Sequence, residues 1–154
     1  MKTLTYFLTI LSLTISTLAE HFYTTDPHGE LAPGLGYHLE GAACYVSTTQ
    51  QSGTVPIYRW MNPKQGLHFY TADPNGELAP QLGYDYEGIA YYLFPNEVSG
   101  SVPFYRWNGK SGHFYTTNAA EGSNTGFAFE GITGWVFPGP VAGFGELYRW
   151  INDK

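Results

Sequence analysis

The chain reads His68-Phe69-Tyr70-Thr71-Ala72-Asp73 near its centre, and nearly the same six residues occur once before and once after this stretch. The earlier copy begins at His21 and the later copy at His113, which gives a period of about 45 residues. Periods of this length are typical of proteins in which similar supersecondary units pack against one another. The sequence therefore predicts three related units.

Two more motifs follow each copy in a fixed order, so the repeat extends through the whole unit. The second motif is an aromatic segment that ends in Glu-Gly, and the third is Tyr-Arg-Trp preceded by an apolar residue. The Glu-Gly motifs occupy 36–41, 83–88 and 126–131, and the Tyr-Arg-Trp motifs occupy 58–60, 105–107 and 148–150. The three units accordingly span 21–67, 68–112 and 113–154.

Residues 1–19 have the pattern of a secretory signal peptide. A short basic start at Lys2 precedes an apolar and hydroxyl-rich run, and the small residues of Thr17-Leu18-Ala19 suit cleavage. We therefore expect a secreted, extracellular protein whose single β-repeat domain spans residues 20–154. No other stretch approaches the roughly 20 apolar residues that span a bilayer, so membrane insertion is not expected.

Composition limits both the fold and the partners. The chain contains 13 Tyr, 10 Phe, 19 Gly and 10 Pro, and its formal net charge is −6. Aromatic residues favour strands and Gly and Pro favour turns, so the composition predicts an all-β fold. An acidic surface repels phosphate groups, so nucleic acid is not expected as a partner. The only cysteine, Cys44, lies in an apolar run and is expected to be a buried thiol.

The order of the motifs predicts how the strands pair. Turn sequences at Asn62-Pro63 and Asn108-Gly109 join each Tyr-Arg-Trp strand to the following His-Phe-Tyr strand, which indicates hairpins. The first and last strands lack such a partner, and they become partners if the three units close on themselves. Closure removes exposed sheet edges. We therefore expect a closed pseudo-threefold domain, best matched by a β-trefoil-like fold, with a compact propeller-like ring as the alternative.

Alternation of side chains along a strand places one Glu and one Arg of each unit on the aliphatic face. An unpaired buried charge costs several kcal/mol, so these residues are expected to form ion pairs at or near the core. The pattern leaves open whether each pair lies within one unit or joins two units. The residues concerned are Glu40, Arg59, Glu87, Arg106, Glu130 and Arg149.

The repeated aromatic and polar residues are consistent with sugar binding. A flat aromatic ring packs on the C–H face of a pyranose while nearby polar groups bind its hydroxyls, and three weak sites gain avidity on a multivalent glycan. We therefore predict a non-enzymatic, lectin-like module for glycans of a cell wall or cell surface, although the tryptophans also suit a core. The candidate ligand-binding residues are His21, Tyr23, Asp26, Trp60, His68, Tyr70, Asp73, Trp107, His113, Tyr115, Asn118 and Trp150.

Two other functions remain open. A small secreted hydrolase would use the His and Glu residues, but these recur three times as scaffold residues do. A protein-interaction or inhibitor domain would act through the loops at 47–53, 95–101 and 138–145. The His residues lack the spacing of a metal site, so neither a metal nor another cofactor is expected.

The combined motif resembles a family of secreted repeats of unknown function that occurs in fungi and bacteria, often appended to hydrolases. The resemblance rests on His-Phe-Tyr-Thr-Thr, Gly-Tyr-x-x-Glu-Gly and Val-Pro-x-Tyr-Arg-Trp, and it covers residues 21–154. The third unit departs from it, with Phe127 in place of Tyr and Gly145-Glu146 in place of Val-Pro. The resemblance implies an extracellular repeat domain and carries over no catalytic residue or ligand.

Overall fold

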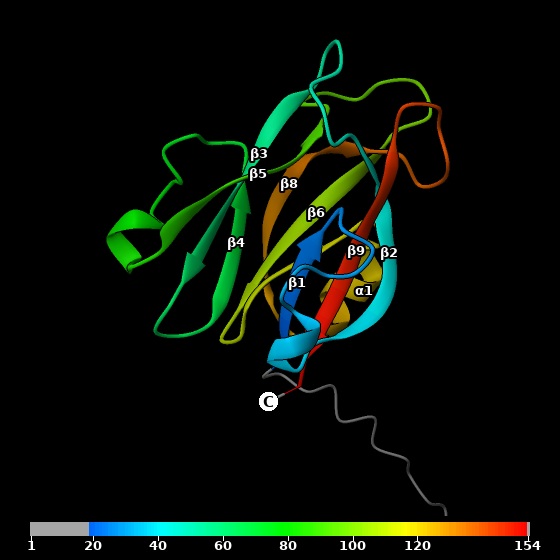
Figure 1. Ribbon diagram of the computed structural model, residues 1–154. Helices are drawn as coiled ribbons and strands as arrows, with labels where there is room; N and C mark the ends of the chain where they lie inside the picture. Colours follow the sequence, from blue (N-terminus) through cyan, green and yellow to red (C-terminus); the bar gives the residue numbers. More distant parts are fainter. Residues whose placement is uncertain (1–18, 154) are drawn as a thin grey trace, which may run out of the picture.

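The computed structural model describes residues 19–153, and within them the protein is all-β, as predicted (Figure 1). The predicted signal peptide lies almost wholly outside the described residues. Two single-turn 3-10 helices (Pro33–Leu35 and Pro80–Leu82) and one short α-helix, α1 (Ala119–Asn124), connect the strands. The strands are β1 (Glu20–Thr24), β2 (His38–Val46), β3 (Val55–Asn62), β4 (Leu67–Thr71), β5 (Asp85–Leu93), β6 (Val102–Gly109), β7 (Gly112–Thr116), β8 (Ala128–Val136) and β9 (Gly145–Asn152).

The strands form three antiparallel sheets of three strands each, in the orders β1-β9-β2, β4-β3-β5 and β7-β6-β8. The central strand of every sheet carries Tyr-Arg-Trp, and its two neighbours come from the following unit. The predicted hairpins are present, because β3 pairs with β4 and β6 pairs with β7. The predicted pairing of the terminal strands is also present, since β1 and β9 lie side by side with Glu20 opposite Asn152 (Figure 1).

The β-trefoil expectation is not confirmed, because no sheet of the described residues closes into a barrel. Isolated bridges instead connect each sheet to the other two. Tyr45 of β2 bridges to Phe137, Ser47 bridges to Tyr92 of β5, and Phe94 bridges to Trp135 of β8. The edge strands β2, β5 and β8 are thereby joined to one another near their carboxyl ends.

Three tyrosines, one from each His-Phe-Tyr motif, occupy the centre of the molecule. The side chains of Tyr23, Tyr70 and Tyr115 are at most 1% exposed. The Tyr23 hydroxyl donates to the Tyr115 carbonyl, that of Tyr70 to the Tyr23 carbonyl, and that of Tyr115 to the Tyr70 carbonyl. Each hydroxyl also accepts a hydrogen bond from the backbone N–H of the same partner residue. The three units are therefore joined by a cyclic set of six buried hydrogen bonds.

Apolar residues from the central and edge strands complete this core. Ile57, Phe104 and Leu147, one from each central strand, are fully buried beside the tyrosines. Cys44 is 2% exposed, and burial raises the pKa of its thiol, so it remains protonated at neutral pH. No helix in residues 19–153 is long and apolar enough to cross a membrane.

Candidate functional site

A charged cluster lies at each junction between neighbouring sheets, and the cluster around Arg106 illustrates the pattern. The guanidinium group of Arg106 in β6 binds Glu77 through two nitrogens, at 2.7 and 3.1 Å, and its Nε lies 2.8 Å from Glu130 in β8. Its Cζ lies 5.1 Å from the ring centroid of Phe69, which belongs to β4 of the preceding sheet. Arginine suits this place because its planar fork binds carboxylates while its face packs on an aromatic ring.

The same cluster recurs at the two other junctions. Arg59 binds Glu30 and Glu87 and lies over Phe22. Arg149 binds Glu40 and Glu121 and lies over Phe114. All three predicted Glu–Arg partnerships are therefore present. In each pair the Arg and the Glu lie in the same sheet but belong to consecutive units. The pairs lie near the core but are not fully buried, since the Arg side chains are 15–18% exposed.

The second carboxylate of each cluster is held in place by a turn after the first strand of the unit. Both carboxylate oxygens of Asp26 accept backbone N–H groups, from His28 and Glu30, and Asp73 makes the equivalent bonds. In the third unit the Asn118 side chain caps α1 by accepting from Ala120 and Glu121. Asp and Asn serve equally here because the turn requires only a side-chain oxygen acceptor.

Glu30 and Glu77 adopt left-handed backbone conformations, with φ of 54° and 55°. Such conformations are unfavourable for residues with a Cβ and persist only where the surroundings impose them. The Asp side chain fixes the turn from one side, and the arginine fixes the glutamate side chain from the other. The strained backbone conformations therefore occur at the two glutamates whose carboxylates bind the junction arginines.

A histidine stands at each junction beside the strand glutamate. His21 Nε2 lies 3.5 Å from Glu40, and His113 Nε2 lies 3.3 Å from Glu130. His68 has an additional partner, because its Nδ1 lies 2.8 Å from the carboxylate of Glu20, a residue only 7% exposed. The Tyr37 hydroxyl donates to the same carboxylate.

The electrostatics of the clusters follow from their partners. The hydrogen bond from Arg106 holds the pKa of Glu77 below its usual range, and Arg59 does the same for the pKa of Glu30. Burial lowers the pKa of His113 to about 4, so this ring is neutral at neutral pH. Each cluster thus contains two carboxylates against one guanidinium and has an excess negative charge.

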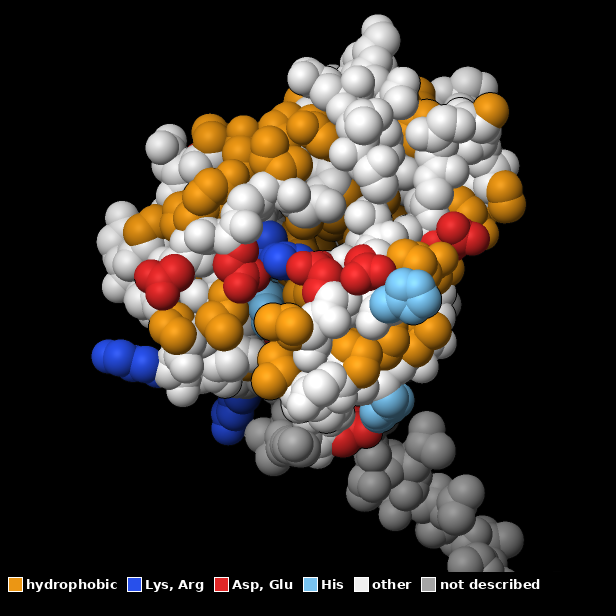
Figure 2. Space-filling model, in the orientation of Figure 1, with side chains coloured by type: hydrophobic (Ala, Val, Ile, Leu, Met, Phe, Trp, Pro, Cys, Tyr) orange, Lys and Arg blue, Asp and Glu red, His pale blue; other side chains and the backbone are white. Residues whose placement is uncertain are grey.

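Every cluster borders a surface cavity. The cavities lined by Arg59 and Arg106 have volumes of about 170 and 190 Å³. The third cavity, which we call the Arg149 cavity, is lined by the Arg149 partners Glu40 and Glu121 and has a volume of about 540 Å³. Exposed leucines form the rim of the two smaller cavities: Leu31 and Leu35 at one, Leu78 and Leu82 at the other. Figure 2 shows this combination on one face, where a row of acidic side chains flanks a basic one above a band of apolar side chains.

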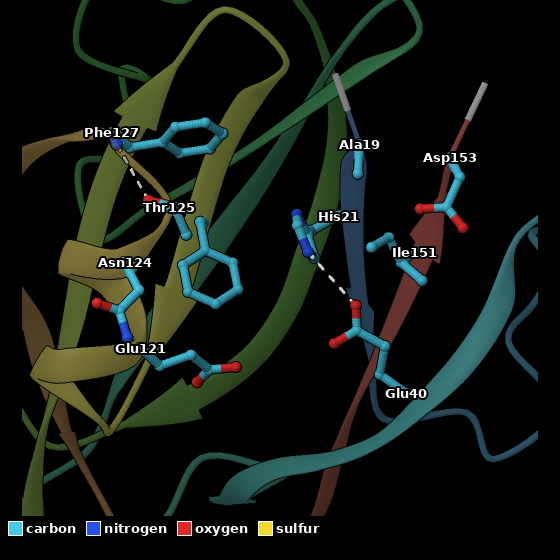
Figure 3. Close-up of a pocket in the computed structure, with 10 residues that line it drawn as sticks. Ala19, His21, Glu40, Glu121, Asn124, Thr125, Phe127, Ile151 and Asp153 are labelled. Carbon is cyan, nitrogen blue, oxygen red and sulfur yellow. Dashed lines mark hydrogen bonds and ion pairs between the residues drawn. The ribbon is translucent and has the colours of Figure 1, made fainter. Parts of the chain in front are cut away.

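The largest of these three cavities lies between two walls. One wall is formed by Ala19, His21, Glu40, Ile151 and Asp153, and the segment from Glu121 to Phe127 forms the opposite wall (Figure 3). The first wall comes from β1 and the residue before it, from β2, and from β9 and the residue after it, and the second comes from α1 and the residues that follow it. The space between the walls is open to solvent.

The structure places the twelve predicted ligand-binding residues in four different environments. The three histidines border the cavities. The three central tyrosines are buried in the core, and their burial leaves no surface for a ligand. Asp26, Asp73 and Asn118 bind turn backbone, so they position other residues.

The tryptophans of the third motif are also removed from solvent. Trp60, Trp107 and Trp150 are 8–9% exposed. Each indole packs beneath a glycine, and the glycines are Gly76, Gly122 and Gly29 in the same order. A Cβ at any of these glycines would approach the indole to 2.6 Å or less, so the close approach requires glycine. The core interpretation of the tryptophans therefore agrees with the structure.

Sequence reasoning missed the second carboxylate and the phenylalanine of each cluster. A signal for the carboxylates was present, because Glu30 and Glu77 occupy the same place in the repeated Asp-Pro-x-Gly-Glu stretch, and Glu121 follows Asn118. The phenylalanines belong to the most regular motif of all. Their partner arginine lies on the next sheet, and a strand pattern does not identify contacts between sheets.

Within residues 19–153 no group of three or more His, Cys, Asp or Glu side chains is arranged to hold a metal ion. Each junction presents hydrogen-bond acceptors, a guanidinium group, an imidazole ring and aromatic faces.

Comparison with known proteins identifies the family. A family described as a domain of unknown function, DUF5648, matches residues 10–137, and the chain belongs to this family. No curated protein and no solved structure matches the chain.

Proposed function

We propose that the protein is a secreted, non-enzymatic module that binds carbohydrate in the cavities between its sheets. The observation that carries this proposal is the composition of each junction, where an aromatic ring, two carboxylates, a guanidinium and a histidine meet at a solvent-open cavity. Sites of this kind offer an apolar face for the C–H groups of a sugar ring and polar groups for its hydroxyls.

The Arg106 cavity illustrates how the contacts would be shared. Phe69 and Tyr84 lie on its apolar side, with their ring centroids 6.3 Å apart and near-perpendicular planes. Glu77, Glu130 and Asn108 supply acceptors and donors on the other side. Carboxylates have spare lone pairs even when they are bound to arginine, so they can accept from sugar hydroxyls. The excess negative charge disfavours anionic ligands.

The arrangement of the cavities supports binding to a multivalent partner such as a cell wall or cell-surface glycan. Each junction borders a cavity, so the sites face different directions and can engage separate chains. Three weak sites on one rigid domain gain avidity when the glycan is dense. The expected secretion of the chain places it where such glycans occur. A closed, propeller-like ring with pseudo-threefold symmetry is the architecture that we propose for this arrangement.

A second candidate function is supported by one asymmetric feature. Among the three junction histidines, and within the residues that the structure describes, only His68 is held by a buried carboxylate, Glu20, while its Nε2 lies 3.8 Å from Glu87. A histidine oriented in this way can serve as a general base in a small hydrolase. Release of reducing ends from polysaccharides by the wild type, lost in H68Q and retained in H113Q, would establish this activity.

A glycan array with residues 20–154 tests the proposed function. The matched variants fill the three cavities together (L35W, L82W and N124W) or add a tryptophan to an exposed loop outside them (Q50W). We expect selective binding of one sugar class by the wild type and by Q50W, and loss of binding by the triple variant. An array without signal, or binding unchanged in the triple variant, contradicts the proposal.

A further inference from the structure

We infer that the Arg149 cavity is the principal site of the protein and that it takes a single amino-sugar ring carrying a free ammonium group. This inference rests on the proposed function and assigns both a dominant site and a ligand class to it. Repetition of the three motifs alone predicts three equivalent sites, whereas the three cavities of the folded molecule differ in volume.

Cavity size separates the three junctions. Pockets that enclose small ligands have volumes of about 300–1,000 Å³. The Arg149 cavity, at about 540 Å³, lies within this range, whereas the cavities of about 190 and 170 Å³ lie below it. The larger cavity can therefore surround a whole ring, and the smaller ones accommodate only part of one.

The difference follows from the sequence of the third unit. In the first two units a 3-10 turn places two exposed leucines at the rim of the cavity. In the third unit α1 replaces that turn, and the corresponding wall presents Asn124 and Thr125. This wall is more polar than the leucine-bearing walls of the other two cavities, and the aromatic faces of Phe114 and Phe127 remain in the lining. The cavity thus gains space and hydrogen-bonding groups while keeping its apolar surfaces.

Charge determines which sugar fits this cavity. Glu40, Glu121 and Asp153 line it, and Arg149 binds the first two from outside the lining. Among the described residues of this junction, carboxylates therefore exceed cations by two when His21 and His38, the partner of Asp153, are neutral. At the Arg106 cavity the excess is one, from Glu77 and Glu130. A nearby opposite charge stabilises an ammonium group, so the cavity favours an amino sugar over its N-acetylated or neutral analogue.

Isothermal titration calorimetry with residues 20–154 tests this inference. The probes are β-1,4-linked tetramers of glucosamine, N-acetylglucosamine and glucose, at about pH 6, where the amine is protonated. We expect about one site per chain, with the glucosamine tetramer binding at least fivefold more tightly than the other two. N124W should abolish this binding, whereas L35W and L82W should leave the Kd within about twofold of the wild type.

A charge variant at the rim tests the specificity separately. Asp153 is 55% exposed, lies outside the arginine cluster and pairs at 3.7 Å with His38, which is also exposed. Because exposed pairs contribute little to stability, D153N should weaken the glucosamine preference without disturbing the fold. E97Q, which removes an exposed carboxylate from a loop between β5 and β6, is the control. Three sites per chain, binding that survives N124W, or equal affinity for the three tetramers overturns the inference while leaving sugar binding in place. Absence of binding to any glycan overturns the proposed function as well.

Discussion

At the scale of single residues, the central tyrosines account for how three units become one domain. Each hydroxyl both donates to a carbonyl and accepts from an N–H group of the same neighbouring tyrosine. Because these groups are wholly buried, removing one hydroxyl leaves two backbone groups without a partner. Loss of a buried partner costs about 1–3 kcal/mol for each orphaned group.

Y70F should therefore lower the free energy of unfolding by about 2–5 kcal/mol, since Tyr23 loses the partner of its N–H and its carbonyl. The control is Y58F, at a half-buried tyrosine outside this hydrogen-bonded set. Urea denaturation measures both. Equal stability of Y70F and Y58F would contradict the role given to the tyrosine cycle.

His113 makes stability depend on pH. Burial and, secondarily, the positive charge of Arg106 lower its pKa to about 4, whereas Glu130 and Glu77 act in the opposite direction. Between pH 6.5 and 4 the unfolded chain therefore binds a proton that the folded protein does not bind, so stability falls as the pH falls through this window.

The expected loss is up to about 3 kcal/mol across that window, and it should be smaller in H113Q, which does not titrate. Urea denaturation at pH 6.5, 5.5 and 4.5 gives the dependence of the free energy of unfolding on pH for the wild type and for H113Q. Identical slopes for the wild type and H113Q would show that His113 is protonated as readily in the folded state as in the unfolded one.

At the scale of elements, each arginine cluster connects the central strand of one sheet to the first strand and turn of the preceding sheet. Arg106 is 18% exposed, and its partners Glu77 and Glu130 are 37% and 28% exposed. Replacing it leaves two half-buried carboxylates facing each other without a cation.

R106M should accordingly lower the free energy of unfolding by about 2 kcal/mol, between the values for exposed and buried pairs. R106K keeps the charge but not the two-nitrogen contact with Glu77, so it should recover only part of the loss. In thermal or urea denaturation the free energy of unfolding should decrease in the order wild type, R106K, R106M. A change below about 0.5 kcal/mol in R106M would mean that solvent screens the cluster.

Part of this element-level arrangement could be predicted from the sequence. The repeated Asn-Pro and Asn-Gly turns indicated the hairpins, and strand alternation indicated that Glu40 and its equivalents meet an arginine. Alternation does not reveal the bulges near Gly41, Gly88 and Gly131, where the register between paired strands shifts. It also does not distinguish a core tyrosine from a surface tyrosine, because the side chain has both an apolar body and a polar tip.

At the scale of the whole molecule, β9 completes the sheet that contains the N-terminal strand. It lies between β1 and β2, so both lose their hydrogen-bonding partner without it. The terminal pairing was predictable because only these two motifs lacked a hairpin partner. The packing of three separate sheets was not, because the repeat length fits a trefoil equally well.

Deleting residues 149–154 removes half of this strand together with Arg149 and Trp150 and should abolish cooperative unfolding. A chain that ends at Asn152 keeps all of β9 and should melt like the full-length chain. Circular dichroism during heating measures the unfolding transitions of the two truncated chains. Unchanged melting of the shorter chain would mean that β9 is dispensable for the fold.

NMR titration of ¹⁵N-labelled residues 20–154 with the best glycan from the array tests most directly whether the cavities between the sheets bind glycan. We expect the chemical-shift changes to concentrate at the cavity walls, most strongly from Glu121 to Phe127 and at His21 and Ile151. Shift changes confined to the loops at 47–53, 95–101 and 138–145 would contradict it.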